Sequence, residues 1–331
     1  MKSQFILLCM VLSAIVGCKS GNDRLKVDVS GVAVKPVTIY RYDLDLFKTG
    51  TDLSSHLLAI RNNYPFFLDT DLSDPAKLSE MQAYLDNPRN REFNEAVARK
   101  YPDISALEIK LADMFRHFRH YFPEFIQPRV YAYISGGDYD YPVQYADTVL
   151  LIGLDNYLGK DFKPYTGDGL PAYRITRMVE EQILTDCAKA MLNAWFPRKF
   201  SGNNLLEQMV EAGKRLYLLD AVLPDEAIRL KIGYTELQYN WIVKNEKHVW
   251  TAIIANRMLY TTDGQLIRSF MADGPFTTEF SKDSPPRLGE WIGWRIVSGY
   301  MENKPGESLR EMLDEKDAQQ ILSQSGYKPG E

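Results

Sequence analysis

The sequence predicts an α+β fold that is predominantly helical and contains a small β-sheet. Residues 129–135 and 148–152 are short runs rich in Val, Ile, Leu and Tyr, which is typical of β-strands. Apolar residues recur at helical spacing through most of residues 53–122 and again after residue 171. The 331 residues are 45% hydrophobic and 12% aromatic, as expected for a globular core and not for a disordered chain.

The N-terminal half is expected to combine strand and helix. Residues 27–42 are rich in Val, Ile and Tyr and predict one or two short strands. Ser73-Asp74-Pro75 is a typical helix start, because aspartate caps the free N–H groups and proline suits the first turn. Asp103 is expected to cap a further helix that runs to Phe122.

The remainder of the chain is predicted to be mostly helical. Residues 138–145 form an aromatic and acidic loop between the two predicted strands, and one long helix is expected from Pro171 to about Trp195. The later helices are predicted at residues 204–219, 224–230, 235–259 and 291–301, with two short ones ending by residue 325. Because no repeat or clear linker divides the chain, we predict a single domain over residues 27–331.

The N-terminus has the features of a bacterial lipoprotein signal peptide. A positively charged start precedes an apolar run at residues 5–16, which is too short for the about 20 residues that span a bilayer. Ile15-Val16-Gly17-Cys18 then fits a lipobox, in which a small residue precedes cysteine. We expect cleavage of residues 1–17 and a lipid on Cys18. The alternative is an ordinary secretory signal. Cleavage of such a signal favours an A-x-A-like site, and this sequence has none there.

Residues 18–26 are expected to form a short lipidated tether. Lys19 follows the cysteine, where an aspartate often signals inner-membrane retention, and residues 19–22 carry no acidic run of the kind that resembles a surface-export signal. We therefore expect a periplasm-facing protein of the cell envelope, anchored in the outer membrane. The net charge of −5 and the lack of a basic run give no support for nucleic-acid binding.

His117 and His120 are a candidate metal site, because histidines three residues apart can share a helix face. The apolar stripe of their predicted helix lies elsewhere, so we interpret both as surface histidines. A metal site that uses this pair stays the alternative. The sequence contains no H-E-x-x-H zinc motif, and we predict neither a metal nor another cofactor.

Two polar residues of the predicted helix at 171–195 fall on its apolar face, namely Gln182 and Asp186. An inward-facing carboxylate must be paired or hydrogen-bonded, or stay protonated, so Asp186 is either a structural acid or part of a cleft. Cys187 remains alone once Cys9 leaves with the signal peptide and Cys18 is lipidated. A lone cysteine on a helix is expected to be a small buried hydrophobic residue.

The loop residues Asp138, Tyr139, Asp140 and Tyr141 could bind a sugar, a peptide or calcium, or could simply be solvated. Farther along, Trp291 and Trp294 accompany glycines 289 and 293, which lie one helical turn apart. Glycine at that spacing allows a second backbone to approach closely, so we interpret this region as tight packing and not as a site.

Several segments together resemble the gliding-motility lipoprotein B family (GldB) of Bacteroidota. The resemblance extends from about residue 27 to the end of the chain, and each segment alone is short. The segments are residues 40–47, 121–125, 130–136, 152–159, 213–217, 274–277 and 286–297. The resemblance implies a lipid-anchored envelope protein that is associated with gliding or with envelope secretion.

The GldB family is distantly similar to predicted zinc peptidases that carry an H-E-x-x-H helix. If the helices are superimposed, Asp186, Cys187 and Ala190 stand where the first histidine, the glutamate and the second histidine would be. A zincin needs both imidazoles and the carboxylate. The resemblance therefore implies a degenerate zincin-like domain, with Gln182, Asp186, Cys187 and Ala190 in a vestigial cleft.

The function predicted from these features is that of a non-enzymatic, lipid-anchored scaffold or binding component of motility or envelope machinery. Its expected partners are the membrane, through the lipid on Cys18, and other envelope proteins. One alternative is a metal-dependent hydrolase or peptidase with an atypical site. Another is a glycan-binding lipoprotein that uses the loop at Tyr139.

Overall fold

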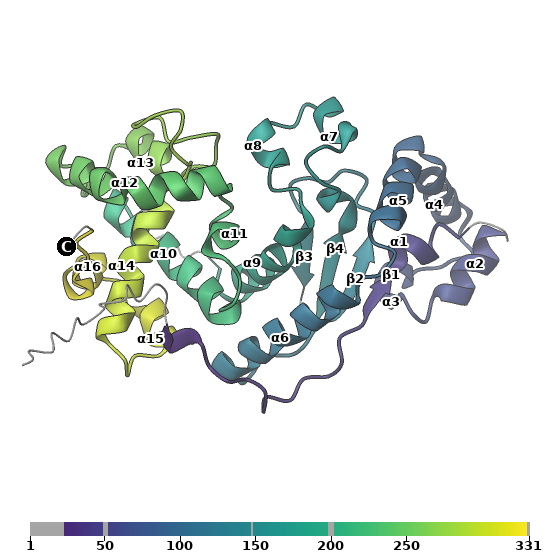
Figure 1. Ribbon diagram of the computed structural model, residues 1–331. Helices are drawn as coiled ribbons and strands as arrows, with labels where there is room; N and C mark the ends of the chain where they lie inside the picture. The colour runs from purple at the N-terminus through teal and green to yellow at the C-terminus, as the bar shows by residue number, and fades with distance from the viewer. Residues whose placement is uncertain (1–22, 49–51, 147, 198–201, 330–331) are drawn as a thin grey trace, which may run out of the picture.

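The computed structural model describes residues 23–329 except 49–51, 147 and 198–201. Cys18 and the predicted signal peptide thus lie outside the described residues. The described fold is predominantly helical with one four-stranded sheet, as the sequence predicts. Figure 1 shows the sheet between the N-terminal helices α1–α5 on one side and the C-terminal helices α10–α16 on the other.

The sheet has the strand order β1-β2-β4-β3. Its strands are β1 (Ile39–Arg41), β2 (Arg129–Tyr133), β3 (Val143–Ala146) and β4 (Val149–Gly153). β1, β2 and β4 are parallel, and β3 pairs antiparallel with β4. The sequence predicted β2, β4 and one or two strands within residues 27–42, where the structure has one, β1. The prediction that residues 138–145 form only a loop is wrong at its end, since β3 begins at Val143.

The N-terminal helices follow the predicted pattern. They are α1 (Tyr42–Asp45), α2 (Leu53–Ile60), α3 (Pro65–Leu68), α4 (Pro75–Asp86), α5 (Pro88–Lys100) and α6 (Ser105–Tyr121). The Asp74 carboxylate accepts the Ala76 N–H at 2.8 Å, which confirms the helix start at Pro75. The N-cap of α6 is Ile104 and not Asp103 as predicted, but the Asp103 carboxylate accepts the Ser105 N–H at 2.8 Å and so binds the first residue of the helix.

The single helix predicted from Pro171 to Trp195 is broken in the structure. The chain forms α7 (Lys163–Gly167), α8 (Ala172–Ile175) and, after an interruption, α9 (Ile183–Trp195). Val179 is extended at the interruption, and the Met178 carbonyl accepts the Gly159 N–H at 2.9 Å. Tertiary hydrogen bonding therefore overrides local helix propensity here.

The C-terminal part is a set of packed helices. They are α10 (Leu205–Val222), α11 (Ile228–Ile232), α12 (Glu236–Ala255), α13 (Gly264–Met271), α14 (Leu288–Asn303), α15 (Leu309–Asp314) and α16 (Ala318–Ser325). The sequence predicted each of these except α13, which is a short amphipathic helix. No described helix is both long and apolar enough to span a membrane.

Helices α10 and α14 meet at glycines. A Cβ atom on Gly293 would lie 1.7 Å from the Met209 carbonyl oxygen, and one on Gly213 would lie 2.2 Å from the Gly293 carbonyl. Only hydrogen at these positions allows the two backbones to touch. The predicted tight packing at Gly293 is therefore confirmed.

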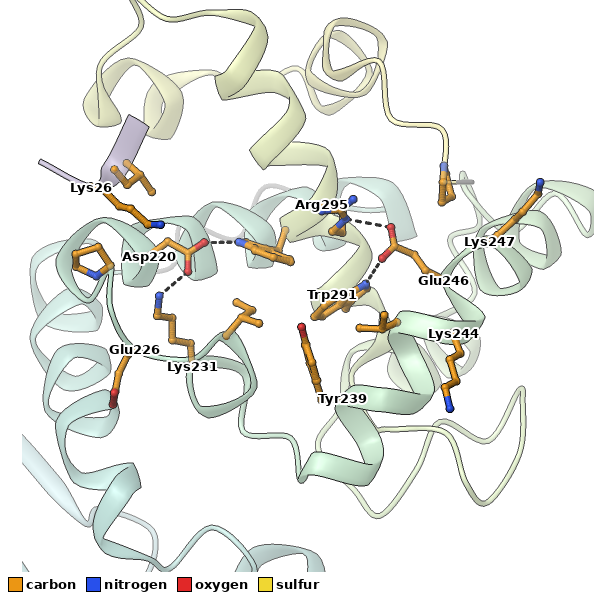
Figure 2. Close-up of a pocket in the computed structure, with 16 residues that line it drawn as sticks. Lys26, Asp220, Glu226, Lys231, Tyr239, Lys244, Glu246, Lys247, Trp291 and Arg295 are labelled. Atoms are coloured by element: carbon orange, nitrogen blue, oxygen red, sulfur yellow. Dashed lines mark hydrogen bonds and ion pairs between the residues drawn. The ribbon is translucent and has the colours of Figure 1, made fainter. Parts of the chain in front are cut away.

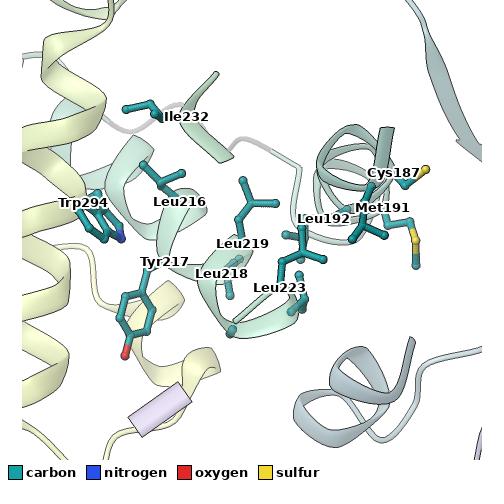
Figure 3. Close-up of a cluster of buried hydrophobic side chains, with 14 of the residues drawn as sticks. Cys187, Met191, Leu192, Leu216, Tyr217, Leu218, Leu219, Leu223, Ile232 and Trp294 are labelled. Carbon is teal, nitrogen blue, oxygen red and sulfur yellow. The ribbon is translucent and has the colours of Figure 1, made fainter. Parts of the chain in front are cut away.

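The main hydrophobic core joins one face of the sheet to α6, α9, α10 and α14. Figure 3 shows Cys187, Met191 and Leu192 of α9 within this core, beside leucines of α10. The Cys187 side chain is fully buried, as predicted. A second hydrophobic cluster, which includes Tyr131 and Leu151, covers the opposite face of the sheet.

The prediction of two surface histidines is half wrong. His120 is exposed and its ring contacts Tyr121 edge-on, but His117 is only 3% exposed. The apolar periodicity of α6 reveals only one buried face. Because α10 also packs against α6, a second part of the helix surface is covered.

Candidate functional site

The two polar regions that the sequence singled out meet in one pocket of about 270 Å³. Tyr139 and Asp140 line it from the loop after β2, and Gln182 and Asp186 line it from the start of α9. The remaining lining residues are Pro142, Asn156, Tyr157, Arg174, Arg177, Met178, Lys189 and Asp273. Sequence reasoning identified both halves of this pocket but did not predict that they come together.

Asp186 has hydrogen-bond partners, as an inward-facing acid requires. The Tyr157 hydroxyl donates to its carboxylate at 3.0 Å, and the Gln182 amide donates at 3.1 Å. The Lys189 ammonium lies 4.0 Å from the same carboxylate. Burial and the charge of Asp186 raise the pKa of Tyr157 well above its ordinary value, so Tyr157 remains a protonated donor.

Lys189 brings a cation to the pocket wall. About a third of its side chain is exposed (33%), and removal of the rest from water lowers its pKa. The neighbouring Asp186 raises the same pKa, which partly offsets the burial. The two residues thus form a partly exposed pair of opposite charges on the pocket wall.

The loop at Tyr139 is held in place from two sides. Arg89 donates to the Tyr139 hydroxyl at 3.0 Å, and that hydroxyl donates to Asp168. Arg174 donates to the Tyr139 carbonyl at 2.7 Å and to the Asp140 carboxylate at 2.9 Å. These contacts fix the loop backbone, so the pocket wall is preformed.

The other two predicted loop residues lie away from the pocket lining. Tyr141 is 65% exposed, and its N–H bonds to the Asp138 carboxylate at 3.3 Å. Within the described part of the chain, no group of three or more His, Cys, Asp or Glu residues is placed to hold a metal ion.

Asp273, in the segment that follows α13, contributes to the pocket from the C-terminal part of the chain. The Arg177 guanidinium donates to the Asp273 carboxylate at 2.5 and 3.2 Å, and Arg287 approaches it at 3.5 Å. Burial raises the pKa of Asp273, but the two guanidinium groups outweigh it and hold that pKa below its usual value. Asp273 directly precedes the segment 274–277, which was noted only for its resemblance to the family, so its contribution to the pocket was missed.

Cys187 and Ala190 do not line this pocket. Cys187 lies in the main core, where burial raises its pKa well above the usual value, and Ala190 packs against the same core. Of the four residues predicted to form a cleft, Gln182 and Asp186 therefore face the pocket, whereas Cys187 and Ala190 contribute to packing.

A larger cavity of about 720 Å³ lies between α10, α12 and α14 (Figure 2). Trp291 and Trp294 pack as predicted but also form part of its wall. Their indole N–H groups donate to Glu246 at 2.9 Å and to Asp220 at 2.6 Å. Lys231 donates to the same Asp220 at 2.8 Å, so these inner charges are already paired and stabilise the helix packing.

The comparison with protein families agrees with the resemblance seen in the sequence. The family model described as gliding motility protein GldB matches residues 22–329. No curated protein and no solved structure matches the chain. The family match covers every described helix and strand. The chain therefore belongs to the GldB family of gliding motility proteins.

Proposed function

We propose that this protein is a lipid-anchored, non-catalytic component of the cell envelope that serves gliding motility by binding another envelope protein at the pocket beside Asp186. Membership of the GldB family supports a role in gliding motility. The observation that carries the proposal is the meeting of Tyr139, Asp140, Gln182 and Asp186 in one preformed pocket.

The size and charges of the pocket favour a protein ligand. Its volume of about 270 Å³ is slightly below the roughly 300–1,000 Å³ of pockets for drug-sized molecules, so it suits one protruding side chain. Its wall carries three cations and three acids, which pair as Arg174 with Asp140, Arg177 with Asp273 and Lys189 with Asp186. A polar side chain of a partner can replace one member of such an ion pair. This replacement contributes to the specificity of binding more than to its affinity.

The absence of catalysis is proposed from the positions that correspond to the zincin motif. Asp186 stands at the first histidine position, and its carboxylate is engaged by Tyr157 and Gln182. Cys187, at the glutamate position, is enclosed in the core, and Ala190 has no group that could bind a metal. In this interpretation the pocket beside Asp186 serves recognition and not catalysis.

The proposed anchor at Cys18 would keep the pocket near the membrane. Arg24 donates to the carbonyls of Met301 and Lys304 at 2.7 and 2.9 Å, so the first described residues are fixed against the end of α14. The five Cα-to-Cα steps from Cys18 to Asp23 can span at most about 18 Å. A lipid at Cys18, on the periplasmic leaflet of the outer membrane, would thus restrict the partner to membrane-proximal proteins.

The proposed function can be tested by replacing the gene in a gliding host of the family. Arg177→Ala removes one pocket cation, and Arg99→Ala is the matched control because Arg99 is 71% exposed on α5. We expect Arg177→Ala to abolish gliding at normal protein level and melting temperature, while Arg99→Ala glides normally. Normal gliding of a correctly folded Arg177→Ala protein would refute the pocket as the functional site.

The enzymatic alternative is tested by metal analysis. His117 carries a buried Nδ1 atom without a hydrogen-bond partner among the described residues, and its Nε2 atom lies 3.7 Å from the Asp113 carboxylate. We expect no stoichiometric zinc in the purified protein. Stoichiometric zinc that is lost in His117→Ala or His120→Ala would replace the scaffold interpretation with a hydrolase.

A further inference from the structure

One side of α12 is exposed along the whole helix. Of its 20 residues, only Ile242, Val249 and Ile253 are buried, and at about 100° per residue these three share one side. The exposed positions fall on the opposite side, which we call the outer face of α12. The outer face includes Leu237, Val243, Lys244, Lys247 and Ile254. α12 is thus attached to the protein along one side, and its outer face is available for contact.

Three large aliphatic side chains belong to the outer face. Leu237 is 82% exposed, Val243 is 52% exposed and Ile254 is 47% exposed. Among the described residues, no other large hydrophobic side chain is as exposed as Leu237. Because Leu237 and Ile254 lie at opposite ends of the helix, these side chains extend over about 25 Å. A row of this length suits contact with an extended surface.

The charges on the outer face that lack a partner are positive. Lys244 and Lys247 are exposed and form no ion pair within the described residues. Glu236, the first residue of the helix, already pairs with Arg229 at 3.1 Å, and Glu246 is turned inward and only 13% exposed. The whole chain carries 44 acidic and 39 basic residues, so this face differs in sign from the protein as a whole. It is therefore complementary to a negatively charged surface.

The start of the described chain borders the same cavity as the outer face. Lys26 lines the cavity of about 720 Å³ together with Lys244 and Lys247. Figure 2 shows Lys26 on one side of this cavity and the two lysines of α12 on the other. Asp23 lies at most about 18 Å from Cys18 along the chain. A lipid on Cys18 would therefore bring a bilayer within reach of α12.

We propose that the outer face of α12 lies on an anionic membrane surface, with its aliphatic side chains among the lipid headgroups and its two lysines at their phosphate groups. This inference rests on the lipid anchor of the proposed function. Exposed aliphatic residues beside lysines are the features with which an amphipathic helix lies in the plane of a bilayer interface. The anchor holds a bilayer at this part of the molecule, whereas a soluble partner would have to enter between the two.

Contact at α12 would fix the orientation of the protein on the membrane. The pocket beside Asp186 has no lining residue on α12. A partner protein can therefore bind at that pocket while the outer face rests on the bilayer. Anchor and helix together provide the two signals that stable membrane association requires.

The test uses residues 18–331 with Cys18→Ala, so that no anchor lipid holds the protein to the vesicles. Every described helix and strand lies at residue 23 or later, so this chain contains the whole described fold. Binding is measured by flotation with vesicles of phosphatidylglycerol and phosphatidylcholine in equal parts, and with vesicles of phosphatidylcholine alone. We expect saturable binding to the anionic vesicles that weakens as salt is added, and much weaker binding to the neutral ones.

A pair of lysine variants assigns the charge dependence to α12. Lys244→Gln combined with Lys247→Gln should weaken binding to the anionic vesicles about thirtyfold, because each lysine at such a surface contributes about fivefold. Lys110→Gln combined with Lys163→Gln is the matched control. It removes two exposed lysines from α6 and α7 and changes the net charge equally, so it should bind as the parent chain does.

A second pair of variants tests the aliphatic contact. Leu237→Gln should weaken binding to the anionic vesicles about tenfold, since it removes an apolar side chain that enters the interface. Ile109→Gln is its control, because Ile109 is 72% exposed on α6 and should not touch the vesicle. Both changes lie at exposed positions, so the melting temperature should stay that of the parent chain.

Three results would overturn the proposal. These are equal binding to anionic and neutral vesicles, binding that the lysine pair at α12 leaves unchanged, and displacement from the vesicles by soluble glycerol phosphate, which would assign the lysines to a small phosphate ligand. The anchor is tested separately, by labelling the full chain with a radioactive fatty acid. Failure of vesicle binding leaves that label in place, and absence of the label leaves the vesicle result unchanged, so the two claims are distinguished.

Discussion

The contact between α10 and α14 makes a quantitative prediction for Gly293→Ala. A Cβ atom would lie 1.7 Å from the Met209 carbonyl oxygen and 2.4 Å from its carbon. Real Cβ contacts are essentially never shorter than 3.0 Å, so the two backbones must separate by about 1.3 Å. The end of a flexible side chain could rotate away from the added Cβ atom, but the Met209 backbone cannot.

The expected cost follows from two opposing effects. Overpacking of a dense core costs about 1–3 kcal/mol, and the backbone-to-backbone clash places this case near the upper end. Alanine is favoured over glycine in a helix by about 1 kcal/mol. The free energy of unfolding should therefore fall by about 2 kcal/mol, measured by urea denaturation with circular dichroism.

Gly167→Ala is the matched control for this experiment. Gly167 ends α7 and has nothing within 4 Å of the position of its missing Cβ atom. This variant should be neutral or stabilised by up to about 1 kcal/mol. Equal stability of Gly293→Ala and the parent chain would refute the close helix contact on which the C-terminal packing depends.

Three further predictions concern buried polar groups. Burial lowers the pKa of His117, so the unfolded chain takes up a proton before the folded chain does as the pH falls. The free energy of unfolding should therefore decrease below about pH 6.5. In urea titrations, His117→Asn should reduce this dependence on pH, whereas His120→Asn should not. Lys231→Met leaves the Asp220 carboxylate, which is 11% exposed, without its cation. The free energy of unfolding, measured by urea denaturation, should fall by about 3–5 kcal/mol. A decrease of less than about 1 kcal/mol would contradict this prediction. In residues 18–331 with Cys18→Ala, Cys187 should resist a thiol reagent until the protein unfolds, and rapid labelling of the native protein would contradict its burial.

Local sequence patterns predicted the elements that local interactions stabilise. Asp74 and Pro75 mark the start of α4 in the sequence, and the same residues cap it in the structure. The apolar runs of β2 and β4 were also sufficient to predict these strands, because both strands contribute to the main core. β3 was missed because its four residues are too few to show an alternating pattern against the acidic loop before it.

The errors arose where distant parts of the chain decide the outcome. At the helix break near Val179 the Met178 carbonyl accepts the Gly159 N–H, a contact that local periodicity does not reveal. His117 is buried on a helix that packs against α9 and α10, both of which lie later in the sequence.

The candidate site was predictable in its parts but not as a whole. The rule that an inward acid needs partners anticipated the hydrogen bonds to Asp186, and the aromatic and acidic character of the loop drew attention to Tyr139 and Asp140. That these residues share a pocket follows from the helix break, which no sequence pattern indicated. Tyr157 lies in segment 152–159, which was noted only for its resemblance to the family, and Lys189 lies in a segment interpreted only as helix.

Site-specific photocrosslinking in intact cells tests the central proposal most directly. A benzoylphenylalanine at position 139, at the pocket, is compared with one at Ile109, which is 72% exposed on α6. We predict that the Tyr139 position crosslinks to one discrete envelope protein in the lipidated chain, that Ile109 does not, and that Arg177→Ala removes the product. No specific product at position 139, or the same product from both positions, would contradict partner binding at this pocket.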